Sequence, residues 1–128
     1  MDQPAPRNRS DVDNPEAWAL VIDAFGAQHP RLRRHFYDRD TLGRARYGAP
    51  LAVWNGRDAV RDLREEMLDS LAYGAQVLHR ALDAHLADPG NASAVKLRAT
   101  LALHMRSTLD MLESLEDWGD AVPKEPTP

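Results

Sequence analysis

Apolar side chains recur at helical spacing through the centre of the chain. Between residues 57 and 87 the only helix-breaking residue is Gly74. The pattern predicts one helix from Asn55 to about Ala87, with about 30 residues and a length of roughly 45 Å. The apolar positions that define its inner face are Val60, Leu63, Met67, Leu71, Leu78, Ala81 and Leu82.

A second long helical stretch follows the turn sequence DPGN. Asn91 or Ser93 is a suitable N-cap for this helix, and Gly119 marks its end. Because the connecting turn is short, the two long helices are predicted to pair as an antiparallel hairpin. The apolar stripe on the last helix has near-heptad spacing. It consists of Val95, Leu101, Met105, Leu109, Leu112, Leu115 and Trp118.

Two shorter helices are predicted nearer the N-terminus. The first begins with Asn14 as its N-cap and Pro15 in its first turn, and it ends near Gly26. The second runs from about Pro30 to Arg46. The predicted inner faces carry Trp18, Val21, Ile22 and Phe25 on the first helix, and Leu32, His35, Phe36, Leu42 and Tyr47 on the second.

The sequence YGAPLAVWNG is predicted to be a loop, because glycine, proline and asparagine recur in it. Asn55 near its end is predicted to cap the long central helix, and Asp58 is placed to complete a capping box. This start would put Arg57 in the first turn of that helix. The free backbone N–H groups of a first turn favour anions.

Composition supports a helical fold. The chain has 19 Ala and 16 Leu but only 8 Val and Ile together, a balance that favours helices over sheets. Aromatic side chains are few, which predicts a lean core and a dimer. We therefore expect an all-α bundle of about four helices that packs as a dimer. Residues 14–120 would form one domain between flexible tails at 1–13 and 121–128, both rich in proline and charge.

The charge distribution is uneven. The net charge is −4, but residues 31–64 carry nine Arg and four acids, while residues 65–128 carry five bases and eleven acids. A net acidic chain argues against a general nucleic-acid coat or a polybasic membrane anchor. The N-terminus has no apolar leader, and no apolar run approaches the length of a membrane span. We expect a soluble, cytoplasmic protein without disulfides or catalytic thiols, because cysteine is absent.

Acidic residues crowd into the first turns of the predicted central helix. At 100° per residue, Asp62, Glu66 and Asp69 lie within about 60° of one another, and Glu65 lies nearby. Such a carboxylate stripe can supply the oxygen ligands that Mg²⁺ or Mn²⁺ prefers. An ordinary solvated helix face explains the same arrangement, because the apolar face is centred about 140° away.

The segment from Arg44 to Leu82 resembles the central segment of MazG-like nucleotide pyrophosphohydrolases and related small bacterial and phage proteins. The resemblance covers about 40 residues and rests on five features in order. They are Arg46-Tyr47-Gly48, Pro50-Leu51, Asn55-Gly56-Arg57-Asp58, Glu66-x-x-Asp69 and Tyr73.

The resemblance implies an all-α, Mg²⁺-dependent hydrolase, dimeric or larger, in which a water attacks a phosphoanhydride of a nucleoside triphosphate. Glu66 and Asp69 match the ExxD pair of that family. The family also has an ExxE pair on the preceding helix, where this chain has only Asp38 and Asp40 as acids. The remaining ligands would come from Asp62 and Glu65, or from a second copy whose stripe faces the first. Otherwise the site is incomplete.

Basic and aromatic residues near this segment are candidate nucleotide contacts. Arg57, Arg46 and Arg61 are candidate phosphate ligands, and Trp54 and Tyr47 are candidates for stacking on the base. The alternative roles are structural: the two aromatic rings pack, and Arg57 pairs with a neighbouring acid. The five histidines have no metal-ligand spacing, so we interpret them as structural or solvent-facing.

Three functions remain open from the sequence. The first is the nucleotide pyrophosphohydrolase, and the second is a non-catalytic helical module that binds a protein or a nucleotide. The third is a helical DNA-binding regulator, which only the basic middle segment supports. We do not expect nucleic acid as a partner, because the net charge is acidic and no helix-turn-helix pattern is evident.

Overall fold

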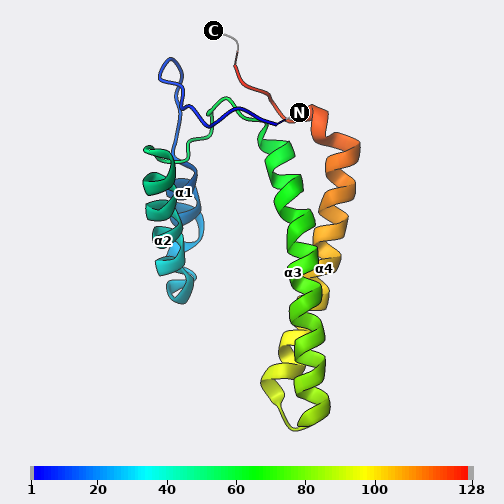
Figure 1. Ribbon diagram of the computed structural model, residues 1–128. Coiled ribbons are helices and arrows are strands. Elements are labelled where there is room, and N and C mark those ends of the chain that lie inside the picture. Colours follow the sequence, from blue (N-terminus) through cyan, green and yellow to red (C-terminus); the bar gives the residue numbers. More distant parts are fainter. Residues whose placement is uncertain (1, 127–128) are drawn as a thin grey trace. The chain divides into compact units, whose positions relative to one another are not determined.

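The computed structural model describes residues 2–126 and confirms the all-α prediction (Figure 1). Within these residues there are helices and no β-strand. The chain divides into two compact units. One contains the residues up to Asp58 together with those from Lys124 onward, and the other is Ala59–Pro123.

The second unit consists of two long helices, α3 (Ala59–Ala87) and α4 (Ala92–Trp118), which lie side by side (Figure 1). The side chain of Asn91 caps α4, because its Oδ1 accepts a hydrogen bond from the Ala94 N–H at 3.0 Å. Asn91 rather than Ser93 is therefore the N-cap, and α4 ends before Gly119 as predicted.

Contacts along the pair join the start of α3 to the end of α4. Gly119 lies against Val60, and Gly74 lies against Met105. Between these points, Arg64 Nε is 3.4 Å from Glu116 Oε1. This order of contacts sets which residues of the two helices lie level with each other.

The residues that face the neighbouring helix form a contact row on each helix, with alternating spacings of three and four residues. All members are buried or half-buried. They are Val60, Arg64, Met67, Leu71, Gly74, Leu78, Ala81 and His85 in α3, and Ala94, Arg98, Leu101, Met105, Thr108, Leu112 and Leu115 in α4, with Gly119 directly after it.

The best buried members of these rows are small: Gly74, Ala81, Ala94 and Thr108. No large side chain is fully buried anywhere in residues 2–126. Several apolar residues predicted for the inner faces are instead exposed beside the rows. They are Leu63, Val95, Leu109 and Trp118.

The first unit contains two shorter helical segments. The first is α1 (Ala17–Val21), which continues as a π-helical turn over Ile22–Gly26, and the second is α2 (Pro30–Tyr47). The rings of Trp18 and Phe36 stack with centroids 6.2 Å apart, which joins α1 to α2. The prediction of α2 is confirmed to within one residue at its end, where Gly48 adopts the left-handed conformation (φ 72°).

The prediction that Asn14 caps the first helix is wrong. Glu16 occupies the N-cap position and makes no side-chain cap. Asn14 instead binds the loop after α2, because its Nδ2 donates to the Trp54 carbonyl at 2.8 Å and its Oδ1 accepts from the Trp54 N–H at 2.7 Å. The Asn14 side chain therefore bonds to a residue 40 positions away and does not cap the helix that follows it.

The segment before α1 runs beside the same loop. The Arg7 N–H donates to the Asn55 carbonyl at 2.8 Å, and the Arg9 N–H donates to the Trp54 carbonyl at 3.0 Å. Arg9 also pairs with Asp11 and lies 3.7 Å from Glu125. The predicted division into one domain and two flexible tails stays a prediction.

The prediction that Asn55 caps α3 is also wrong, because α3 begins at Ala59. Asn55 is buried, with 8% of its surface exposed, and its Oδ1 accepts from the Arg57 N–H at 3.2 Å. Asn55 therefore stabilises the loop.

Among the described helices, none combines the length and the apolar character needed to cross a bilayer.

Candidate functional site

The four predicted metal ligands lie together in the first three turns of α3. Glu65, Glu66 and Asp69 are exposed, and Asp62 is half-buried. The contact row at this end of α3 passes through Arg64 and Met67, so helical geometry directs Asp62, Glu66 and Asp69 away from α4. The structure thus brings these carboxylates to one side of a single helix.

The carboxylates differ in their partners. Glu65 is bound by Arg61, whose Nε donates to Oε1 at 3.1 Å one turn earlier. Within residues 2–126, neither Glu66 nor Asp69 has a hydrogen bond or an ion pair from its side chain. Their oxygens are therefore open to an external cation.

A metal ion held by this stripe would need ligands from outside it. Within the part of the chain that the structure describes, no three His, Asp or Glu side chains are grouped to hold a metal. Mg²⁺ is commonly held by one or two carboxylates, with substrate phosphates and waters completing its shell. Glu66 and Asp69, one turn apart, can supply two carboxylates of such a shell.

The predicted phosphate ligands divide between the units. Arg61 is on α3, whereas Arg46 and Arg57 belong to the first unit. The prediction that Arg57 lies in the first turn of α3 is wrong, because it precedes that helix and its Nη1 donates to the Pro4 carbonyl at 2.6 Å. It therefore lacks the helix N-terminal position that motivated its assignment.

The two predicted stacking residues are held differently. Tyr47 is 55% exposed, and the Arg46 guanidinium lies over its ring, 5.3 Å from the centroid. This contact is a cation–π interaction. Trp54 is half-buried, with its backbone fixed by Asn14. Trp54 is therefore part of the packing of the first unit, and the Tyr47 ring is the more accessible of the two.

Sequence reasoning missed a groove between α3 and α4. Its volume is about 640 Å³, and its lining is mainly apolar. The lining residues are Ala75, Leu78, His79 and Leu82 in α3, with Val95, Arg98, Ala99 and Ala102 in α4. The signal in the sequence is the small side chains Ala75, Ala99 and Ala102, each of which directly follows a contact-row residue. A search for helix faces based on large apolar side chains does not identify these alanines.

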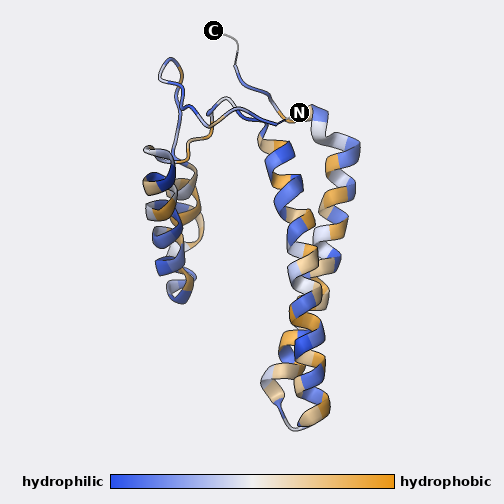
Figure 2. Ribbon diagram, in the orientation of Figure 1, coloured by the Kyte–Doolittle hydropathy of each residue, from blue (hydrophilic) through white to orange (hydrophobic). Residues whose placement is uncertain are grey.

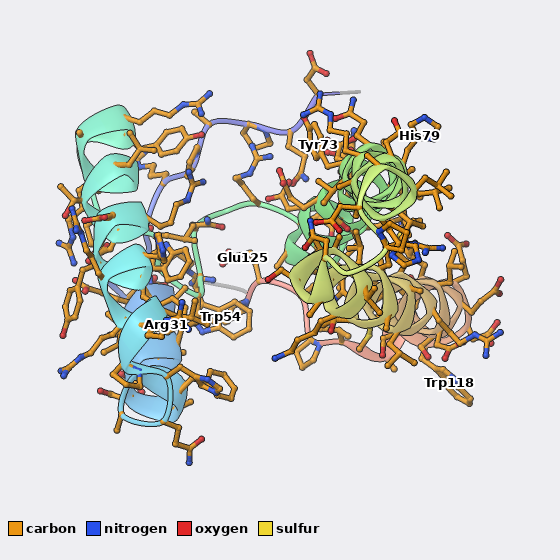
Figure 3. All side chains as sticks on the ribbon, turned by 90° about the horizontal axis from the view of Figure 1, so that it is seen from below. Arg31, Trp54, Tyr73, His79, Trp118 and Glu125 are labelled. Carbon is orange, nitrogen blue, oxygen red and sulfur yellow. The ribbon has the colours of Figure 1, made fainter. Side chains whose placement is uncertain are left out.

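Some large side chains of α3 and α4 point outward, and of these His79 lines the groove. Figure 3 shows Tyr73 and His79 projecting from α3 and Trp118 projecting away from the helix pair. Trp118 is 71% exposed, although the sequence pattern assigned it to the inner stripe. Four of the five histidines are exposed, including His35 from the predicted inner face of α2, and His85 is half-buried in the contact row.

Comparison with known proteins gave no match: no family model, curated protein or solved structure matches this chain.

Proposed function

We propose that this protein is a Mg²⁺- or Mn²⁺-dependent nucleotide pyrophosphohydrolase of the MazG-like kind. The observation that carries the proposal is the pair Glu66 and Asp69, which are one turn apart on α3, exposed and without a protein partner. They stand in a segment whose order of motifs resembles that family. An unpartnered pair of adjacent carboxylates is costly in mutual repulsion, and a divalent cation relieves it.

Each residue has a defined role in this proposal. A bound cation would polarise the phosphoanhydride and lower the pKa of the attacking water. Glu66 and Asp69 supply its protein ligands, and Asp62 and Glu65 extend the acidic surface around it. The guanidinium group of Arg61, which lies on the same helix as this pair, would neutralise phosphate oxygens.

The proposal includes a homodimer or a higher homo-oligomer of the α3–α4 pair, arranged as an antiparallel hairpin. The small buried side chains of the contact rows support it, because they leave most large apolar side chains of the pair exposed. A second copy would cover this surface.

The test is a screen of nucleoside triphosphates with Mg²⁺ and Mn²⁺, coupled to inorganic pyrophosphatase and phosphate detection. We expect turnover by the natural protein and at least about a 100-fold loss in Glu66→Gln and Asp69→Asn. Asp110→Asn is the matched control, because Asp110 is an exposed acid on α4. It should keep full activity. A folded sample that turns over no nucleotide would contradict the proposal.

The second candidate is a non-catalytic helical interaction module. The groove and the exposed apolar side chains of α3 and α4 favour it, because such surfaces mark sites of association. Calorimetry separates the two functions. Nucleotide binding without turnover would favour the module. Equal heats of Mg²⁺ binding to the natural protein and to Glu66→Gln would also favour it.

A further inference from the structure

The helix α2 is strongly basic. It contains six Arg and two Asp, and all six arginines are exposed. In Figure 2, most of this helix has hydrophilic colours. The acidic net charge of the chain does not describe this surface, because residues 59–123 carry eleven acids and six bases. The surface of α2 therefore has to be judged by its own charges.

Basic side chains form a row along one side of α2, which we call the basic row. At 100° per residue its members lie within about 80° of one another, and they extend over about 22 Å of the helix. All of them are exposed. They are Arg31, His35, Arg39 and Arg46, with Leu42 between the last two.

The basic row has no acidic partner. Within residues 2–126, its four basic side chains make no hydrogen bond or ion pair. Asp38 borders the row, but its carboxylate lies 3.7 Å from Arg34 Nε. Arg44 binds two of the other nearby acids, and the third is exposed on the turn before α2. These acids are Asp40, Glu16 and Asp23.

One end of the basic row coincides with the N-terminus of α2. No side chain caps this end, and the first turn contains Arg31 and Arg33 but no acid. The positive end of a helix dipole disfavours cations and favours anions. An anion bound beside Arg31 would relieve this repulsion.

The other end of the basic row carries an accessible aromatic ring. The Arg46 guanidinium lies 5.3 Å from the centroid of the Tyr47 ring, and Tyr47 is 55% exposed. Aromatic rings and arginines beside a basic track are the contacts that stack on unpaired nucleic-acid bases. An acidic peptide or a lipid headgroup supplies no base for this ring. A lipid surface also requires a broad apolar face, and Leu42 is the one apolar member of the row.

We propose that the basic row binds a single-stranded nucleic acid. Arg31, Arg39 and Arg46 contact its phosphates, for which the planar guanidinium fork is well suited. A base stacks on Tyr47. The net acidity of the whole chain, from which nucleic acid was not expected, leaves this local surface basic.

This interaction does not depend on the hydrolase proposal. The basic row belongs to the first unit, whereas Glu66 and Asp69 are on α3. Glu66→Gln should therefore leave the affinity for an oligonucleotide unchanged while it abolishes nucleotide turnover. Failure of one proposal can thus be distinguished from failure of the other.

Fluorescence anisotropy with a labelled oligothymidylate of about 15 nucleotides tests the proposal. We expect the triple variant Arg31→Gln, Arg39→Gln, Arg46→Gln to bind at least about tenfold more weakly. It should also lower the slope of log affinity against log salt by about two, because each phosphate contact in a single strand contributes about 0.7.

A second triple variant is the matched control for charge. Arg80→Gln, Lys96→Gln and Arg106→Gln remove the same number of charges from exposed positions on α3 and α4. This variant should bind within about twofold of the natural protein. Circular dichroism checks that both variants stay helical. Equal losses in the two variants, or no binding by the natural protein at low salt, would overturn the proposal.

The aromatic contact separates a nucleic acid from other polyanions. Tyr47→Ala should weaken binding at least about fivefold, whereas Tyr47→Phe, which keeps the ring, should not. Tyr73→Ala on α3 is the control, because Tyr73 is also exposed. Polyglutamate and phosphatidylserine vesicles should compete poorly with the oligonucleotide. Equal competition by either of them, or equal binding by Tyr47→Ala and the natural protein, would overturn the proposal.

Discussion

Gly74 of α3 lies so close to Met105 of α4 that a Cβ added to the glycine would stand 3.2 Å from the methionine Sδ and 3.3 Å from its Cγ. A glycine inside a helix costs about 1 kcal/mol relative to alanine. Here the missing side chain lets two helices approach closely in a pair whose buried residues are mostly small. The methionine fills the space with a flexible chain.

Gly74→Leu should destabilise the α3–α4 pair by about 1–3 kcal/mol, because the added atoms overpack the contact with Met105. Urea unfolding followed by circular dichroism measures the change. The control is Gln76→Leu, which adds a leucine to an exposed position on the same helix and should leave stability within about 0.5 kcal/mol. Equal stability of the two variants would argue against the close approach.

Two glycines of the first unit should respond to alanine with opposite signs. At Gly43 in α2, an added Cβ meets nothing within 4 Å, so Gly43→Ala should stabilise α2 by about 0.5–1 kcal/mol through helix propensity. Gly48 has a φ of 72°, so Gly48→Ala should destabilise by about 1 kcal/mol. Thermal unfolding of both variants measures these changes in stability. A lower stability of Gly43→Ala would contradict this account.

The helices were predictable because their signals are local. The apolar spacing, Pro30 at the start of α2 and Gly119 after α4 all act within a few residues of the helix they define. The caps assigned to Asn14 and Asn55 failed for the opposite reason. Asn14 binds the loop after α2, which lies 40 residues away, and the side chain of Asn55 closes a turn before α3 begins.

The candidate site was predictable in part. Asp62, Glu66 and Asp69 share a side of α3 because helical geometry alone places them there. The place of Arg57 depends on where α3 begins, and that start depends on loop contacts that no local pattern reveals. The groove also escaped prediction, because alanines create it by being small.

Asn14→Ala should destabilise the first unit by about 1–3 kcal/mol. The variant removes hydrogen bonds to both backbone groups of Trp54 and one to the Arg9 carbonyl. Tryptophan fluorescence during urea unfolding reports the change near Trp54. Asn8→Ala is the milder comparison, since Asn8 donates a single hydrogen bond to the Pro50 carbonyl at 2.7 Å. A larger loss in Asn8→Ala would contradict the role assigned to Asn14.

The Arg9 side chain holds the pKa of Asp11 below its ordinary value of 3.8, through a hydrogen bond to the carboxylate. A carboxyl whose pKa is lower in the folded state adds stability above the unfolded value, and this contribution is lost as the pH falls through the folded value. An NMR titration should give an Asp11 midpoint below 3.8, and Arg9→Gln should raise it. An unchanged midpoint in Arg9→Gln would assign the shift to another cause.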